Sequence, residues 1–233
     1  MQKAAPREVA KSGADLRRTF RTIDRLLESR YGPRRQKGHP EPLDALVMTI
    51  LSQNTNDKNS GQAYQAMRAE FPTWESVMNA PAHELERVLR PGGLAATKSR
   101  RIRAILRSIA KRGPITLRHL RDLPTDRAER ELTAYPGVGY KTARCVLLFS
   151  LGRDVFPIDT HIFRILSRVG LIDGDASRDN AHRAIPQYLP AGRSYPLHMN
   201  LIALGRDLCK PRNPECSLCP LRRLCAFARS RLR

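Results

Sequence analysis

The sequence predicts an all-α protein, on three observations. Apolar residues recur with the period of a helix in several segments, runs of β-branched residues alternating with polar ones are missing, and Gly or Pro interrupts the chain about every ten to twenty residues. A chain of 233 residues is long enough for one or two domains with a buried core. We therefore expect about ten or more short helices joined by tight connections.

Four segments show the i, i+3, i+4 spacing that gives a helix one apolar face. Each of them predicts a helix that packs this face against a core. The apolar positions are Leu16, Phe20, Ile23 and Leu27; Leu43, Leu46, Val47, Ile50 and Leu51; Ile102, Ile105, Leu106 and Ile109; and Ile162, Ile165, Leu166 and Val169.

Two segments interrupt the helical pattern. Residues 31–42 (YGPRRQKGHPEP) are rich in Pro, Gly and charge, as linkers are, and a second break falls at Gly152-Arg153-Asp154. The helices do not form a fixed-period repeat. We therefore expect any domain boundaries at these two breaks.

The charge of the chain favours a nucleic acid as partner. Lys and Arg number 42 against 22 Asp and Glu, which gives a net charge of +20, and residues 87–121 hold eleven basic residues and no acid. Such an excess repels itself and indicates a polyanionic partner. One alternative is an Arg-rich composition that only solvates the surface. A membrane surface is disfavoured, because no predicted helix is both strongly amphipathic and rich in Trp or Phe.

The pattern of apolar residues and cysteines predicts a cytoplasmic protein. No stretch approaches the length of a membrane span, and the N-terminal MQKAAPREVAKSG lacks the apolar core of a secretory signal. In a reducing compartment we expect the five cysteines to stay out of disulfides. Four of them crowd near the C-terminus, which favours a metal site there.

A glycine turn lies between two predicted helices in the segment Tyr135–Ala143. A Pro-Gly-Val-Gly turn at residues 136–139 leaves backbone N–H groups at a helix N-terminus, where they can hold a phosphate. The alternative is a plain connection between two helices.

Lys141 and Asp159, eighteen residues apart, form a candidate catalytic pair. A cation at a helix start opposes the helix dipole and needs a reason. A neutral lysine amine attacks a sugar C1′, expels the base and forms a Schiff base, and both the helix N-terminus and Arg144 favour the neutral amine. A nearby carboxylate stabilises the cationic sugar. The alternatives are a solvated lysine and an ordinary N-cap aspartate.

The four C-terminal cysteines have the spacing Cys209-x6-Cys216-x2-Cys219-x5-Cys225. Four thiolates so close bind either a [4Fe–4S] cluster or one zinc ion. Structural zinc sites more often use two paired C-x2-C units, so the single pair here favours iron–sulfur. Cys145 follows Lys141 in an apolar stretch, and we expect it in the core.

Together, the hairpin, Ile158-Asp159-Thr160-His161 and the cysteine spacing resemble the endonuclease III proteins of the helix-hairpin-helix glycosylase superfamily. The similarity runs from about Pro42 to Cys225. It implies an all-α two-domain fold with DNA in the cleft between the domains. A six-helix bundle that includes the hairpin would span residues 36–153, and residues 1–35 plus 154–233 would form the iron–sulfur cluster domain.

The resemblance also implies an activity, the excision of oxidised pyrimidines from double-stranded DNA, followed by nicking at the abasic site through β-elimination. Lys141 would be the Schiff-base nucleophile and Asp159 its carboxylate, and the four cysteines would hold a [4Fe–4S] cluster. The partner would be DNA that contains damaged pyrimidines or abasic sites, bound by a monomer in the nucleoid. The residues expected to contact this DNA are Asn54, Leu94, Gly137, Val138, Gly139 and Tyr140.

Asn54 and Leu94 match the positions where the family fills the gap left by a flipped nucleotide. The alternatives are a helix C-cap for Asn54 and a buried loop residue for Leu94. Tyr140 departs from a position that is commonly basic in the family, and the Gln53-Asn54 pair departs from the usual loop. Base preference is therefore left open.

Two other functions compete with this one. A monofunctional mismatch or adenine glycosylase activates water and lacks the lysine, so Lys141 argues against it. A non-catalytic DNA-binding module has no need for both Lys141 and Asp159. An assay for nicking of abasic DNA distinguishes the bifunctional enzyme, which nicks the strand, from these two alternatives.

Binding to DNA should depend strongly on salt. Each phosphate that Lys or Arg neutralises contributes about 0.9 to the slope of log affinity against log salt concentration, and we expect a slope of about −4 or steeper from residues 87–121 and the hairpin. Titrations of duplex DNA at several salt concentrations measure this slope. A flat response would mean that the basic run faces solvent for other reasons.

Overall fold

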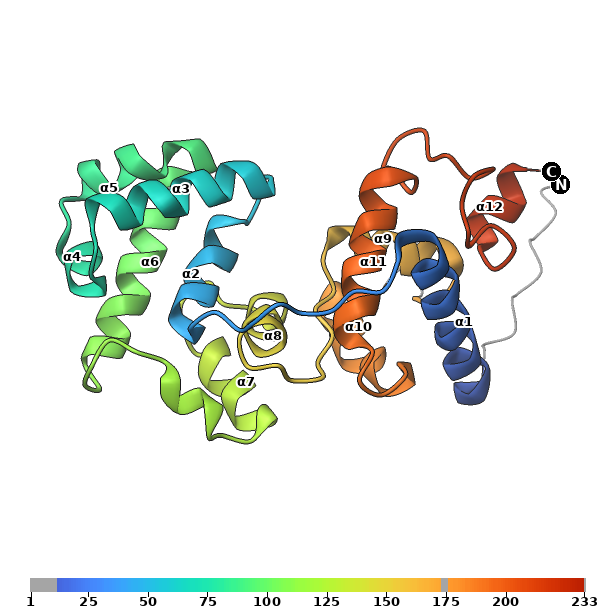
Figure 1. Ribbon diagram of the computed structural model, residues 1–233, viewed down its shortest axis with the longest axis horizontal. Helices are drawn as coiled ribbons and strands as arrows, with labels where there is room; N and C mark the ends of the chain where they lie inside the picture. The colour runs from blue at the N-terminus through green and yellow to red at the C-terminus, as the bar shows by residue number, and fades with distance from the viewer. Residues whose placement is uncertain (1–11, 173–175, 233) are drawn as a thin grey trace, which may run out of the picture. The chain divides into compact units, whose positions relative to one another are not determined.

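Helices form all the regular structure in the residues that the computed structural model describes, 12–172 and 176–232 (Figure 1). No strand occurs among them, so the prediction of an all-α fold is confirmed. The N-terminal residues examined for a secretory signal lie outside the described residues, up to residue 11. The α-helices are α1 (Gly13–Tyr31), α2 (Pro42–Leu51), α3 (Asp57–Glu70), α4 (Trp74–Asn79), α5 (Ala82–Leu89), α6 (Ala95–Ala110), α7 (Thr125–Thr133), α8 (Tyr140–Phe149), α9 (Thr160–Val169), α10 (Arg178–Ala184), α11 (Ser194–Asp207) and α12 (Ala226–Arg231). Short 3-10 helices lie at η1 (Arg90–Gly92), η2 (Arg118–Arg121) and η3 (Pro186–Tyr188).

The chain divides into two compact units. One is Gln36–Pro157, and the other joins Ile158–Arg233 to the N-terminal segment up to Arg35. The first boundary lies within the Pro- and Gly-rich segment that follows α1. The second lies at Pro157, a few residues beyond the glycine at which the break was expected.

The unit Gln36–Pro157 is built around α2. This helix packs against α8, α3 and α6, and its five predicted stripe residues are all buried. An all-round apolar helix is stable only when other helices cover it. The α6 stripe is buried too, and Cys145 of α8 is in the core as expected.

The other unit is built around α11, which packs against both α1 and α9 (Figure 1). The stripe of α9 is fully buried, and so is the stripe of α1 except for Leu16, which is half-buried in the first turns of the helix. Gly205 allows α11 to approach α9 closely, because a Cβ there would overlap His161. No helix in the described ranges is long and apolar enough to cross a membrane.

An ion-pair cluster ties α1 to the start of α11. Arg193 Nε lies 2.6 Å from Asp24 Oδ2, and its Nη2 lies 2.9 Å from Glu28 Oε1. Asp24 is buried, so its carboxylate depends on this guanidinium for compensation. The hydrogen bonds that Arg193 donates to both acids raise its pKa further above its usual range.

We expect Arg193→Met to destabilise this unit by about 2 kcal/mol, because it leaves the Asp24 carboxylate buried without a partner. Calorimetric unfolding of the full chain measures the loss. Arg18→Met is the matched control, since Arg18 pairs with Asp15 on the exposed face of the same helix. Equal effects of the two variants would contradict the role of the buried pair.

Candidate functional site

The turn between α7 and α8 is anchored by its valine. Val138 is buried, and its backbone N–H donates to the carbonyl oxygen of Tyr135 at 3.1 Å. The expectation that the turn leaves its N–H groups free is therefore wrong for Val138. In the described part of the chain, the N–H groups of Gly137 and Gly139 have no hydrogen-bond partner, so they are the free donors of this turn.

The two glycines of the turn differ in their surroundings, and the geometry requires glycine only at position 137. Gly137 has a φ of 74°, and a Cβ there would overlap the side chain of Arg101. Gly139 is the N-cap of α8 and has open space where a Cβ would stand. The approach to the first turn of α8 is thus unobstructed, which suits the binding of an anion at the helix N-terminus.

Lys141 lies in the first turn of α8 and is half-buried. Its Nζ makes no hydrogen bond or ion pair within the residues described. Arg144, one helical turn further along α8, is paired with Glu129, whose Oε1 lies 2.5 Å from its Nε. The same guanidinium lies 6.0 Å from the centre of the Tyr140 ring.

Asp159 is the N-cap of α9. Its Oδ1 accepts a hydrogen bond from the Ile162 N–H at 2.8 Å. The N-cap interpretation is therefore correct, but it uses only one carboxylate oxygen. In the described ranges Oδ2 has no hydrogen-bond partner. Lys141 and Asp159 belong to different units, so the structure describes each of them in its own unit.

Asn54 and Leu94 share an uncommon backbone conformation. Their φ values are 54° and 50°, in the left-handed region, which costs about 1–2 kcal/mol for a non-glycine residue. Both side chains are exposed, and Leu94 is 55% exposed. The alternative of a buried Leu94 is therefore wrong. The alternative C-cap role for Asn54 is also wrong, because Ser52 is the C-cap of α2. Such strain persists where surrounding contacts fix the backbone.

Gln53, next to Asn54, is engaged by side chains from two other helices. Arg101 Nη1 of α6 donates to Gln53 Oε1 at 2.5 Å, and Gln53 Nε2 donates to Thr142 Oγ1 of α8 at 3.3 Å. The departure from the usual family loop thus has a structural explanation, because Gln53 joins its loop to the residue that follows Lys141. Sequence reasoning missed this network, and no local signal points to it.

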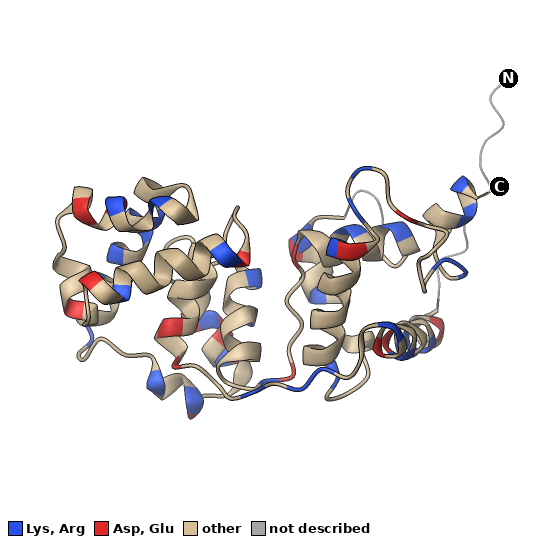
Figure 2. Ribbon diagram, turned by 45° about the horizontal axis from the view of Figure 1, so that its top comes forward, with Lys and Arg blue, Asp and Glu red and all other residues tan. Residues whose placement is uncertain are grey.

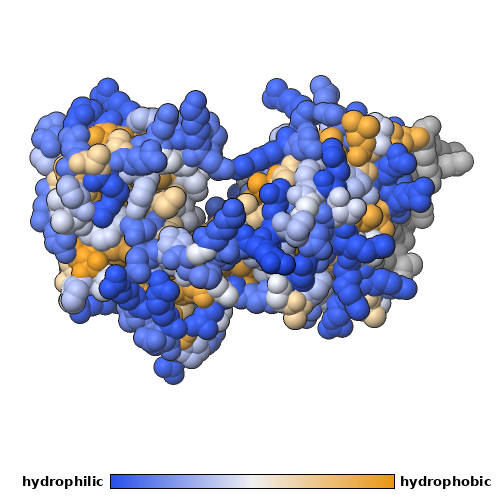
Figure 3. All heavy atoms as spheres, viewed as in Figure 1, coloured by the Kyte–Doolittle hydropathy of each residue, from blue (hydrophilic) through white to orange (hydrophobic). Residues whose placement is uncertain are grey.

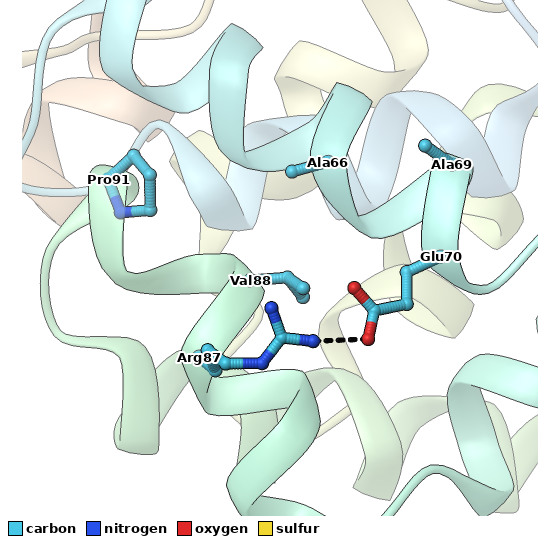
Figure 4. Close-up of a pocket in the computed structure, with 6 residues that line it drawn as sticks. All are labelled: Ala66, Ala69, Glu70, Arg87, Val88 and Pro91. Carbon is cyan, nitrogen blue, oxygen red and sulfur yellow. Dashed lines mark hydrogen bonds and ion pairs between the residues drawn. The ribbon is translucent and has the colours of Figure 1, made fainter.

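The basic run from residue 87 to residue 121 is less exposed than its composition indicates. Lys98 is 2% exposed, and Arg87 is paired with Glu70 of α3 (Figure 4). Further along the run, three arginines have acidic partners; the pairs are Arg112 with Glu131, and Arg118 and Arg121 with Glu41. Basic and acidic residues are accordingly interspersed on the helices of Figure 2, and most of the surface visible in Figure 3 is hydrophilic.

Two of the four cysteines, Cys209 and Cys225, are hydrogen-bonded to Arg168 of α9. Cys209 follows α11, Cys216 and Cys219 lie in the loop, and Cys225 is the N-cap of α12. Arg168 Nη1 donates to Cys209 Sγ at 3.3 Å, and the Arg168 carbonyl oxygen accepts from Cys225 Sγ at 3.2 Å. The Arg168 guanidinium also lies 4.6 Å from the centre of the Phe227 ring. Sequence reasoning did not identify this arginine.

The thiols interact with one another electrostatically. Burial, with a smaller contribution from the other three thiols, raises the pKa of Cys219 to about 11. In the described residues, no group of three or more His, Cys, Asp or Glu side chains could hold a metal ion in this arrangement. A four-iron cluster is wider than one ion, and its donor set is four thiolates alone. The cysteines therefore fit an iron–sulfur cluster by the chemistry of their donors.

Two family models match the chain. Residues 47–191 match the HhH-GPD superfamily of base excision DNA repair proteins, and residues 209–225 match the iron–sulfur binding domain of endonuclease III. The endonuclease III of Thermotoga maritima is 30% identical over 203 residues, covering 85% of this chain and 89% of the relative. An Arabidopsis thaliana protein that carries the name of a DNA glycosylase is 37% identical over 70% of this chain, which spans only 56% of that relative.

Among solved structures, an endonuclease III trapped as a covalent intermediate with DNA aligns with a TM-score of 0.79 and 25% identity. The alignment covers 96% of this chain and all of that one. The chain belongs to the HhH-GPD superfamily of base excision DNA repair proteins. Within it, the chain is a member of the endonuclease III family, a DNA glycosylase with an iron–sulfur segment. The predictions of family, fold, enzyme class and [4Fe–4S] cofactor are confirmed.

We expect the purified protein to be brown, with about four irons per chain and negligible zinc. Elemental analysis measures both metals. Cys216→Ser should lower iron content and thermal stability together, because the loop between α11 and α12 loses one of its anchors. Cys145→Ser removes a thiol from the other unit and should keep the iron. One zinc per chain and no iron would contradict the prediction.

Proposed function

We propose that the protein removes oxidised pyrimidines from double-stranded DNA and then nicks the strand at the abasic site, acting as a monomer. The observation that carries this proposal is Lys141, an amine without a partner in its unit, placed in the first turn of α8 directly after the glycine turn. A structural lysine at a helix N-terminus would oppose the dipole for no gain. The trapped covalent complex of the related endonuclease III supports the same chemistry.

In the proposed reaction, the neutral Lys141 amine attacks C1′ of the damaged nucleotide. The bond from Nζ to C1′ forms as the glycosidic bond breaks, and the base leaves with a proton. Opening of the sugar ring gives the imine. Loss of a C2′ proton then expels the 3′ phosphate, which nicks the strand. We propose that the Asp159 carboxylate stabilises the positive charge on the sugar while the base departs.

We propose that the turn of Gly137, Val138 and Gly139 binds a backbone phosphate. Two free N–H groups and the N-terminus of α8 supply the donors. The buried Val138 side chain fixes the turn rather than touching DNA, and the half-buried Tyr140 lies at its edge. This arrangement would hold the strand next to Lys141.

Asn54 and Leu94 are proposed to fill the gap that the flipped nucleotide leaves. Both are exposed at the tips of loops, and their left-handed conformations hold them in fixed positions. An inserted apolar side chain replaces part of the lost stacking, and a polar one can meet the orphaned base.

Cys209, Cys216, Cys219 and Cys225 would hold the [4Fe–4S] cluster. When bound, the cluster supplies a structural crosslink between α11 and α12 rather than a reacting group. We propose that residues 1–35 plus 154–233 form this cluster domain and that residues 36–153 form the bundle that carries the hairpin.

The nucleophile is tested by borohydride, which reduces the imine to a stable amine. We expect the wild type to give a covalent adduct with abasic duplex DNA. Lys141→Gln should abolish the adduct and change DNA affinity little, because the N–H donors of the hairpin remain. Asp159→Asn should slow base release strongly, yet leave trapping on preformed abasic sites, where no base has to depart.

The readouts are denaturing gels for the adduct and for strand nicking, with affinity measured on the same DNA. Survival of trapping in Lys141→Gln would move the nucleophile elsewhere. Excision of a base by the wild type without any nicking would favour a monofunctional glycosylase. Binding with neither reaction would favour a non-catalytic module.

A further inference from the structure

Lys98 of α6 is a buried lysine that the proposed reaction does not use. Its Nζ donates to the carbonyl oxygen of Leu51 at 2.7 Å and to that of Gly92 at 2.8 Å. Its side chain meets no carboxylate among the residues described. Burial lowers its pKa. Burying an ammonium group is costly unless hydrogen bonds compensate it. The role of Lys98 is therefore to be sought in the two carbonyl groups that it binds.

Both carbonyls lie at the ends of helices. Leu51 is the last residue of α2, and Gly92 is the last residue of η1. The final carbonyls of a helix lack intrahelical partners and carry the negative end of its dipole. One ammonium group therefore caps two helix ends and fixes them next to each other.

Each of these ends leads directly to one of the exposed, left-handed residues. Asn54 follows Leu51 in the turn after α2, and Leu94 follows η1 as the N-cap of α6. The backbone N–H of Lys98 also donates to the Leu94 carbonyl oxygen at 3.0 Å. Lys98 thus holds the Leu94 loop from both sides, through its side chain at Gly92 and through its backbone at Leu94.

The residues around Gly92 are closely packed. A Cβ there would lie 3.2 Å from Ala63 Cβ of α3 and 3.9 Å from Lys98 Nζ. The first distance is tighter than an ordinary contact, so even a methyl group would require Ala63 or η1 to shift by a few tenths of an ångström. The Gly92 carbonyl consequently has little freedom to move away from Lys98.

We propose that Lys98 is a positioning residue for gap filling, whose side chain sets the spacing between Asn54 and Leu94 so that both enter the DNA stack as a preset pair. This inference rests on the proposed function, since it takes these two side chains as the ones inserted. The ligand it serves is a base-paired duplex, because single-stranded DNA has no stack to repair. Lys98 itself touches neither the sugar nor the base.

The test compares two substrates on one variant. Lys98→Met keeps the length of the side chain and removes its donors. We expect borohydride trapping on single-stranded abasic DNA to stay within about twofold of the wild type, and nicking of a paired lesion in duplex DNA to fall about tenfold or more. The fluorescence rise of 2-aminopurine placed beside the lesion, which reports unstacking, should be lost as well. Lys58→Met, an exposed lysine of α3, is the control for the loss of one positive charge.

A double variant of Lys98 and Leu94 distinguishes a positioning role of Lys98 from a general loss of activity or stability. Leu94→Ala should also lower duplex activity, and adding Lys98→Met to it should cost little more, because there is no wedge left to position. Equal losses on single-stranded and duplex DNA, or additive losses in the double variant, would overturn the inference. A wild type that fails to trap abasic duplex DNA would instead overturn the proposed function.

Calorimetry first establishes whether Lys98→Met is folded at the assay temperature. Where it is not, Gly92→Ala decides the matter by the same ratio of duplex to single-stranded activity. This variant keeps Lys98 and places a Cβ 3.2 Å from Ala63 Cβ, so that η1 and α3 must move apart by a few tenths of an ångström and the Gly92 carbonyl shifts relative to Lys98 Nζ. A selective loss on duplex DNA supports the inference, and an unchanged ratio overturns it.

Discussion

The buried side chain of Val138 is the constraint on which the candidate site depends. It fixes the turn between α7 and α8 against the core, and its N–H closes the turn on Tyr135. Of the glycines on either side, Gly139 has open space where a Cβ would stand, whereas the side chain of Arg101 lies against Gly137. The same turn starts α8 one residue before Lys141. Packing of an apolar residue thus fixes both the N–H groups of the turn and the position of the Lys141 amine, and neither follows from charge.

Helix α6 connects this turn to the loops around it. Lys98 and Arg101 are one helical turn apart and act on neighbouring segments. Lys98 fixes the ends of α2 and η1, while Arg101 holds Gln53 and covers Gly137. Thr142, bonded to Gln53, completes the connection to α8. The end of α2, η1 and the turn before α8 are distant in sequence. Lys98 and Arg101 of α6 hold them together with cationic groups that point into the protein rather than into solvent.

What the sequence could predict was local. The stripe of α9 and that of α2 are buried as expected, because helical periodicity depends only on near neighbours. The iron–sulfur segment could also be predicted, because its four cysteines lie within seventeen residues of one another. The contacts of Lys98 and Arg101 join residues 47 and 48 positions apart, and nothing nearby distinguishes these side chains from solvated ones. The acids that neutralise part of the basic run, such as Glu41 and Glu131, also come from outside it.

Acidic partners neutralise part of the basic run of residues 87–121. DNA binding then has two separate contributions, one from exposed cations and one from backbone N–H groups. A backbone N–H that meets a phosphate releases no counterion, because it carries no net charge. Contrary to the expectation from the sequence, the proposed phosphate contact of the hairpin would therefore position the strand without adding to the salt dependence. Only exposed cations contribute to that dependence. In the run of residues 87–121, Arg87 and Arg112 are paired and Lys98 is buried, whereas side chains such as Arg100 and Arg107 are exposed. On the proposed function, general affinity for DNA and the placement of one nucleotide at Lys141 would therefore rest on different groups. Salt would weaken the first and leave the geometry of the second intact.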